Sequence, residues 1–248
     1  MTLSAVVITK DEEATIRRCL ESVSWADEII VVDSGSADST QRICRELGAK
    51  VHVTADWPGF GPQKNRALEL ATGDWILSLD ADEWLTPELQ SEIRSSVARP
   101  GSHVAFRMPR ASSFCGRYMR HSGWWPDPVL RLFVRGRARF SDDLVHERLI
   151  LDGSVGDLTH PLMHESFTSL EEVLHKIDRY SSAGAQMMVA RGHRGSVGSA
   201  VLHGWWTFAR TYFLRAGFLD GREGFMLAVS NAEGVYYRYL KAWLLGKH

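Results

Sequence analysis

The sequence predicts an α/β fold with a parallel-core sheet flanked by helices. Short apolar runs near the amino terminus alternate with segments whose apolar residues recur at helical spacing. The apolar runs give way to loops that contain Asp, Ser or Gly, which are typical turn residues. Because alternation of strands and helices produces right-handed crossovers, we expect the strands to lie parallel in one sheet.

The predicted elements follow one another in a regular order. Residues 3–8 form the first apolar strand, and the helix after an acidic start carries Ile16, Leu20 and Val23. The later elements are a strand at 28–32, a helix carrying Ile43 and Leu47 and capped by Gly48, a strand at 51–53, a helix at 63–71 and a strand at 75–79. The carboxyl ends of four strands therefore point in the same direction.

Polar loops follow the four predicted strands. They are Thr9-Lys10-Asp11, Asp33-Ser34-Gly35-Ser36, Pro58-Gly59-Phe60-Gly61 and Asp80-Ala81-Asp82. Open α/β sheets bind ligands at the carboxyl ends of their strands, so we expect one nucleotide-sugar site here, with Thr9 among its contacts. A nucleotide sugar requires a carboxylate, closely approaching backbone and a metal. Each loop taken alone is also consistent with an ordinary turn.

Asp80 and Asp82 follow the strand at 75–79 with one residue between them. Carboxylates are ligands that Mg²⁺ and Mn²⁺ favour, and these ions usually share their coordination with substrate phosphates. We therefore expect a divalent metal, Mg²⁺ or Mn²⁺, on Asp80 and Asp82. The alternative is a solvated acidic turn before a helix.

Several motifs occur in an order that resembles the family 2 glycosyltransferases. They are Val31-Val32-Asp33-Ser34-Gly35-Ser36-Ala37-Asp38-Ser39-Thr40, Lys64-Asn65-Arg66-Ala67, Ala71-Thr72-Gly73-Asp74 and Leu79-Asp80-Ala81-Asp82-Glu83. The resemblance implies a GT-A fold and inverting transfer from a nucleotide sugar, with a UDP-sugar expected. The sequence departs from the family at Asp11, where Asn is common.

The resemblance assigns roles to residues of the predicted nucleotide-sugar site. Asp33 is implied to contact the base, Lys64 the pyrophosphate, and Asp80 the ribose or the metal. Asp82 is implied to hold the metal. His164 is a candidate for a further metal ligand, with an ordinary loop histidine as the alternative.

An inverting transfer also requires a general base for the acceptor hydroxyl. Glu147 is the predicted base, because Val145-His146-Glu147 resembles the short acidic motif of the family. His146 is the alternative base, and a surface pair on a loop is the other interpretation. Arg131, between apolar neighbours, is predicted to anchor Glu147 or a phosphate, with an outward-facing strand residue as the alternative.

Composition excludes several classes of protein. The chain has 248 residues and a formal net charge of −1, which argues against a generic basic nucleic-acid-binding protein. The amino terminus lacks a basic region, so no signal peptide is expected, and no uncharged apolar run is long enough to span a membrane. The cysteines lack Cys-x-x-Cys spacing, and we expect Cys19 and Cys44 to be buried, reduced thiols in a cytoplasmic protein.

The last part of the chain has a different composition. Residues 200–248 contain 11 of the 25 aromatic residues, together with six basic and three acidic side chains. An aromatic, basic and amphipathic segment is typical of a membrane interface. Helices packed on the catalytic domain or in a dimer are the alternative. We expect a catalytic domain at 1–165 and a helical, membrane-interfacial extension at 166–248.

The carboxyl-terminal half narrows the resemblance. Residues 212–221, with Gly224 and Tyr239-Leu240-Lys241, are similar to the tail of bacterial lipopolysaccharide inner-core β-1,4-glucosyltransferases. This resemblance implies a glycolipid acceptor at the inner face of the cytoplasmic membrane. The predicted function is metal-dependent, inverting transfer from a nucleotide sugar to lipopolysaccharide core or a related glycolipid. The alternatives are a nucleotidyltransferase and a non-catalytic membrane scaffold that binds nucleotide sugars.

Overall fold

The structure is a computed structural model that describes residues 1–141 and 148–247. The chain divides into two compact units, one of Met1–Arg110 with Asp127–His164 and one of Ala111–Pro126 with Glu165–His248. The predicted domain boundary near residue 165 stays a prediction. Within the described ranges, no helix is both long and apolar enough to cross a membrane.

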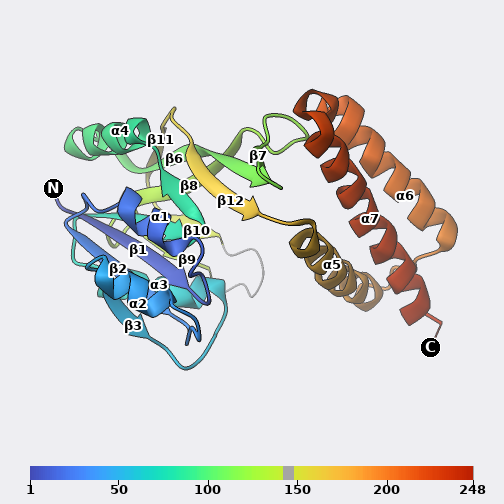
Figure 1. Cartoon of the computed structure of the whole chain (residues 1–248), viewed down its shortest axis with the longest axis horizontal. Coiled ribbons are helices and arrows are strands. Elements are labelled where there is room, and N and C mark those ends of the chain that lie inside the picture. Colours follow the sequence, from blue (N-terminus) through green and yellow to red (C-terminus); the bar gives the residue numbers. More distant parts are fainter. Residues whose placement is uncertain (142–147, 248) are drawn as a thin grey trace. The chain divides into compact units, whose positions relative to one another are not determined.

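A sheet with a parallel core organises the first unit (Figure 1). Its strands lie in the order β3 (Lys50–Val53), β2 (Glu28–Asp33), β1 (Leu3–Thr9), β4 (Trp75–Asp80), β8 (Asp127–Val134), β6 (His103–Phe114), β12 (Leu162–Phe167) and β5 (Glu83–Leu85). β1 pairs in parallel with β2 and β4, and β2 with β3, which confirms the predicted parallel arrangement. β11 (Ser154–Asp157) and β7 (Arg117–Tyr118) pair with β6, and β9 (Ala138–Phe140) pairs with β10 (Leu149–Leu151).

Two hydrophobic cores lie on opposite faces of the parallel strands. β1 is buried along its whole length, and successive side chains alternate between these cores, as the period of a strand requires. Val7 packs with α1 (Ile16–Ser22), α2 (Thr40–Glu46) and α4 (Pro87–Ala98), whereas Val6 packs with α3 (Phe60–Leu70). Cys19 and Cys44 are buried and form no disulfide, as predicted.

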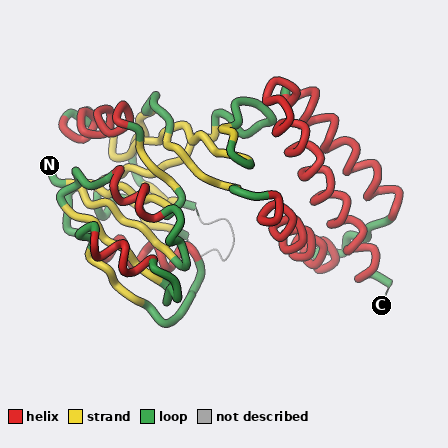
Figure 2. The backbone as a smooth tube through the Cα atoms, in the orientation of Figure 1, coloured by secondary structure: helices red, strands yellow, loops and turns green. Residues whose placement is uncertain are grey.

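Helices dominate the second unit, as predicted for the carboxyl-terminal segment (Figure 2). They are α5 (Leu170–Ala190), α6 (Val197–Ala209) and α7 (Gly221–Leu245), with the short turns η1 (Arg210–Leu214) and η2 (Gly217–Asp220) between the last two. α7 packs against both α5 and α6. Gly204 permits the close approach of α6 to α7, because a Cβ at this position would lie 3.3 Å from the Cβ of Tyr236 on α7.

Glu28 connects the first strands to the loop before β4. Its Oε1 accepts hydrogen bonds from the Ser4 hydroxyl at 2.5 Å and from the backbone and hydroxyl of Thr72 at 2.6 and 2.8 Å. Lys50 Nζ lies 3.0 Å from Oε2. Burial alone would raise the pKa of Glu28, but the hydrogen bonds from Ser4, Thr72 and Lys50 outweigh it and lower the pKa to about 2.

Glu28→Gln should therefore reduce the free energy of unfolding at neutral pH, by on the order of 2–3 kcal/mol. The folded pKa lies below the ordinary value of 4.5, so wild-type stability from this group is full above that value and is lost as pH falls toward about 2. The difference in the free energy of unfolding between wild type and variant, measured by urea denaturation, should therefore shrink as the pH falls from 4.5 toward about 2. Glu69→Gln, an exposed change of the same type, is the control. A gap that stays constant down to pH 2 would contradict this role of Glu28.

Candidate functional site

The register of the parallel strands places three predicted site residues at one edge of the sheet. Thr9 pairs with Asp33 across β1 and β2, and Ile8 pairs with Asp80 across β1 and β4. Thr9, Asp33 and Asp80 are the last residues of β1, β2 and β4. The predicted convergence of the loops after β1, β2 and β4 is therefore confirmed.

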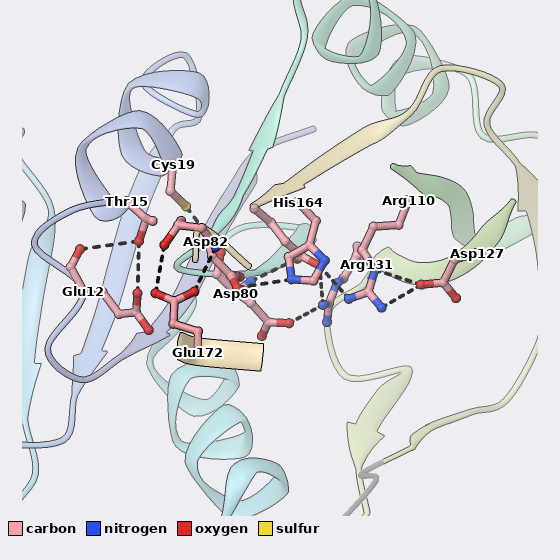
Figure 3. Close-up of polar contacts among 12 residues, drawn as sticks. Glu12, Thr15, Cys19, Asp80, Asp82, Arg110, Asp127, Arg131, His164 and Glu172 are labelled. Carbon is pink, nitrogen blue, oxygen red and sulfur yellow. Dashed lines mark hydrogen bonds and ion pairs between the residues drawn. The ribbon is translucent and has the colours of Figure 1, made fainter. Parts of the chain in front are cut away.

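Asp80 is held between two cationic side chains, Lys64 and Arg131, of which Figure 3 labels Arg131. Lys64 Nζ on α3 lies 2.9 Å from Asp80 Oδ1, and Arg131 Nη2 on β8 donates to Oδ2. Lys64 and Arg131 are 3% and 7% exposed. Burial alone would raise the pKa of Asp80, but the charges of Arg131 and Lys64 hold that pKa well below its usual range. Asp80 is therefore ionised, and its charge is compensated within the protein.

Glu83 extends this cluster into a chain of alternating charges. Arg131 Nη2 lies 2.7 Å from Glu83 Oε1, and Arg110 Nη1 lies 3.2 Å from the same oxygen. Arg110 also donates two hydrogen bonds to Asp127 Oδ2, at 3.0 and 2.7 Å (Figure 3). Because Glu83 has no exposed surface, its negative charge depends on these two arginines for compensation.

Arg131 faces inward, and the alternative of an outward-facing strand residue is wrong. Burial would lower its pKa, but the charges of Asp80 and Glu83 outweigh that effect and raise it. The side chain is a permanent cation that joins two carboxylates. The signal for this role in the sequence was the spacing of Asp80 and Glu83, which end β4 and begin β5 on either side of a two-residue connection.

Asp82 and His164 form a second pair at the same edge (Figure 3). His164 Nε2 lies 3.1 Å from Asp82 Oδ2, and the antiparallel pairing of β12 with β5 sets His164 opposite Glu83. A carboxylate and an imidazole are both ligands of divalent metals. In the described part of the chain, no group of three or more His, Cys, Asp or Glu side chains is arranged to hold a metal ion.

Asp33 shapes the loop that follows β2. Its Oδ1 accepts hydrogen bonds from the backbone of Gly35 and Ser36 at 3.0 and 2.9 Å and from Gln41 Nε2 at 2.7 Å. The Ser36 hydroxyl donates to Oδ2. Asp33 has no exposed surface, so its carboxylate acts on the conformation of this loop. Its implied contact with the nucleotide base stays a prediction.

Asp11 has a left-handed backbone conformation, with φ of 54°. Asn and Asp are the non-glycine residues that tolerate this region best, which explains why Asp stands where the family often has Asn. Asp11 Oδ1 accepts a hydrogen bond from the backbone of Ala37 at 2.7 Å, and the Asp11 backbone donates to Ser36 Oγ at 2.8 Å. The loops after β1 and β2 are therefore bonded together.

Thr9 and Gln63 complete the polar lining of this edge. The Thr9 carbonyl accepts from the backbone of Ser34 at 2.9 Å, whereas its buried hydroxyl has no partner among the described residues. Gln63 was not predicted as a site residue; its side-chain amide donates to Ser34 Oγ at 3.0 Å and to Thr54 Oγ1 at 2.8 Å. Its position beside Lys64 at the start of α3 was the available signal.

The predicted base Glu147 and its alternative His146 lie outside the described residues, as do Asp142 and Asp143. The residues on either side of 142–147 are bonded to each other. The backbone of Ser141 donates to the Arg148 carbonyl at 2.9 Å, and the backbone of Arg148 donates to Ser141 Oγ at 3.0 Å. Next to them, Asn65 on α3 bonds both backbone groups of Phe140, at 2.8 and 2.9 Å.

Comparison with known proteins identifies a family. The protein-family model described as Glycosyl transferase family 2 matches residues 4–153 of the chain. The lipopolysaccharide core biosynthesis glycosyltransferase LpsC of Rhizobium meliloti is 30% identical over 97% of this chain and 94% of its own length. An uncharacterized glycosyltransferase of Rickettsia typhi is 31% identical over 96% of this chain and 86% of its own.

Solved structures share the fold. The S. aureus TarS 1-349 complex with UDP-GlcNAc has a TM-score of 0.53 at 14% identity, covering 100% of this chain and 93% of that one. Glucosyl-3-phosphoglycerate synthase from Mycobacterium tuberculosis, with Mn²⁺, UDP and glucosyl-3-phosphoglycerate, has a TM-score of 0.51 at 20% identity, covering 79% and 82%. The predicted GT-A fold is confirmed.

Arg131→Met should destabilise the protein by about 3–5 kcal/mol, because it leaves two carboxylates without their shared cation. Chemical denaturation at neutral pH measures the change. Arg131→Lys keeps the charge but not the fork of donors, and should cost less. Arg137→Met, at an exposed arginine, is the control. If Arg131→Met unfolded at the same denaturant concentration as the control, the charge chain would not be holding these strands together.

Proposed function

Because this chain belongs to glycosyltransferase family 2, we propose that it is a metal-dependent, inverting enzyme that transfers a sugar from a nucleotide sugar to a lipopolysaccharide core or related glycolipid. The observation that carries the proposal is the charge-compensated Asp80 beside the Asp82 and His164 pair. This arrangement places cationic side chains that can face a diphosphate and possible metal ligands at one edge of the sheet.

The donor in this proposal is a UDP-sugar. The solved structures that share the fold contain UDP-GlcNAc in one case and UDP with Mn²⁺ in the other, which supports this choice. Lys64 is the group that contacts the pyrophosphate, since its ammonium lies at the strand edge and already pairs with an anion. Thr9, opposite Asp33 at the end of β1, has a hydroxyl without a hydrogen-bond partner among the described residues, and we assign it to the nucleotide.

Asp80 contacts the ribose in our proposal. Both of its oxygens already face cations, and a metal on the same carboxylate would be repelled by Lys64 and Arg131. Its side chain is 31% exposed, which leaves one edge available to hydroxyl groups. Arg131 is a positioning residue, because it is buried against Asp80 and Glu83 and holds both carboxylates in place.

Asp82 and His164 hold the metal in this proposal. Their polar atoms already lie within 3.1 Å of each other, and their side chains are partly exposed. A bound Mg²⁺ or Mn²⁺ would neutralise charge on the leaving nucleoside diphosphate. The chain itself contributes Lys64 to the same task, and its hydrogen bond to Asp80 keeps the ammonium in position.

Glu147 is the proposed general base. Arg148, the next residue, is bonded to Ser141, and Phe140 is bonded to Asn65 on α3. The ring of Phe140 lies 5.3 Å from Lys64 Nζ, so the chain enters and leaves 142–147 close to the proposed diphosphate contact. A carboxylate in this region can take the proton of an acceptor hydroxyl.

The acceptor is proposed to be a glycolipid at the inner face of the cytoplasmic membrane. Support comes from LpsC, a relative that matches nearly the whole length of both chains and is named for lipopolysaccharide core biosynthesis. A nucleotidyltransferase would instead attack phosphorus and release pyrophosphate. A non-catalytic scaffold would bind the nucleotide sugar without turnover.

Incubation with UDP-, GDP- and ADP-sugars and Mn²⁺ should release free nucleoside diphosphate and no pyrophosphate, with water taking the sugar when no glycolipid acceptor is added. Asp82→Asn should lower turnover by roughly a hundredfold or more, since it removes a charge from the metal site. The same variant should bind Mn²⁺ more weakly in calorimetry. Asp152→Asn, an exposed change outside the site, is the control. Full activity of Asp82→Asn, or release of pyrophosphate, would rule out the proposed reaction.

Glu147→Gln should reduce transfer by roughly 10²–10⁴-fold, the usual effect of losing a general base. Binding of UDP with Mn²⁺ should be nearly unchanged, because the nucleotide contacts are assigned to other residues, Thr9, Asp33 and Asp80 at strand ends and Lys64 on α3. His146→Gln, made in the same background, should cost much less. A dead His146→Gln beside an active Glu147→Gln would reverse the assignment, and normal transfer by both would move the base elsewhere.

A further inference from the structure

Two loops of the second unit, residues 117–123 and 214–222, are joined by one buried carboxylate. Asp220 is 1% exposed and accepts hydrogen bonds from the backbones of Arg120 and His121 at 3.0 and 2.9 Å. His121 Nδ1 and Ser122 Oγ lie 3.1 and 3.2 Å from the same carboxylate. The backbone of Ser122 donates to the Arg215 carbonyl at 2.8 Å. The backbone positions of Arg120 and Arg215 are therefore set together.

The junction of these loops is close-packed and strained. Ser122 and Ala216 have left-handed φ values of 61° and 52°, which non-glycine residues rarely adopt. A Cβ on Gly217 would lie 2.9 Å from Ser122 Oγ and 2.8 Å from the Thr211 carbonyl oxygen. Strained backbone of this kind persists where the surroundings fix it, and it concentrates at binding sites.

The joined loops carry uncompensated positive charge. They contain Arg117, Arg120, Arg215 and Arg222, and their only acidic residue is the buried Asp220. Arg117 lies 3.8 Å from Glu223, but the other three arginines form no ion pair with the described residues. The Arg120 guanidinium lies 4.6 Å from the centre of the Trp125 ring, which positions it without neutralising it.

Large apolar side chains project beside these arginines. Leu214 and Leu219 are 70% and 55% exposed, and Phe213 and Phe218 are 59% and 50% exposed. Arg215 directly follows Phe213 and Leu214, the last two residues of η1. Exposed apolar groups beside cations are typical of segments that lie in the interface of an anionic bilayer.

α6 continues this surface away from the loops. Its 13 residues contain no Asp, Glu, Lys or Arg, while exposed arginines stand before it at Arg191 and Arg194 and after it at Arg210. Trp205 and Trp206 are at least half exposed. The helix is about 20 Å long, against the roughly 30 Å of a hydrocarbon core, so it is suited to lying in the interface.

We propose that the loops 117–123 and 214–222 form a binding site for the phosphate of an anionic lipid headgroup, with Leu214, Leu219 and their neighbouring phenylalanines inserted into the bilayer beside it. Arg120, Arg215 and Arg222 contact the phosphate, and Asp220 is the positioning residue that holds the loops. The inference rests on the proposed function in one respect, since a glycolipid acceptor would lie in the same bilayer.

Sedimentation of the full chain with phosphatidylcholine–phosphatidylglycerol vesicles, and with pure phosphatidylcholine vesicles, tests the site. Arg120→Ala/Arg215→Ala should weaken binding to the anionic vesicles roughly thirtyfold, which corresponds to about 1 kcal/mol for each arginine. The control Arg99→Ala/Arg137→Ala removes the same charge from exposed positions in the first unit and should bind like wild type. Equal losses in both double variants would overturn the site, because net charge alone would then explain them.

A matched pair of double variants tests the exposed leucines of the proposed site. Leu214→Ser/Leu219→Ser should lose vesicle binding, whereas Leu244→Ser/Leu245→Ser, at similarly exposed leucines near the end of α7, should retain it. Wild-type binding to both vesicle types alike, or displacement by millimolar inorganic phosphate with no need for a bilayer, would overturn a lipid headgroup as the ligand. Thermal stabilisation by UDP with Mn²⁺ should be unchanged in every variant, so loss of vesicle binding is distinguishable from failure of the proposed donor site.

Discussion

The ionised carboxylate of Asp80, held between Lys64 and Arg131, is the interaction on which the rest of the site depends. Asp80 and Lys64 come from the consecutive elements β4 and α3, whereas Arg131 comes from β8, about 50 positions further along the chain. Lys64 and Arg131 are buried, and a buried charge is costly unless an opposite charge compensates it, so their pairing with Asp80 favours the packing of these elements. The same requirement brings Glu83 and Arg110 into the cluster.

Because of this charge compensation, the two aspartates of Asp80-Ala81-Asp82 have different electrostatic environments. Asp80 faces two fixed cations, whereas Asp82 faces the imidazole of His164, a potential metal ligand. A cation is repelled from the first carboxylate and attracted to the second. The proposed roles therefore differ, with ribose and positioning assigned to Asp80 and metal binding assigned to Asp82 and His164.

Much of the parallel core was predictable, because apolar runs and their spacing are local properties of the sequence. The strand-end loops with Thr9, Asp33 and Asp80 follow from that pattern. The partners of those residues did not follow from it, since Arg131 on β8 reaches Asp80 across 51 positions, a contact that depends on the packing of distant elements. Asp220 similarly joins a loop 100 positions away. A missed local signal was the Thr86-Pro87 start of α4, where the Thr86 side chain caps the helix.

Anomalous X-ray scattering at the manganese edge, from crystals grown with UDP and Mn²⁺, tests the division of roles most directly. The account predicts one manganese peak ligated by Asp82 and His164, with Lys64 and Arg131 still paired to Asp80. A manganese ion ligated by Asp80, with either cation displaced from that carboxylate, would contradict it.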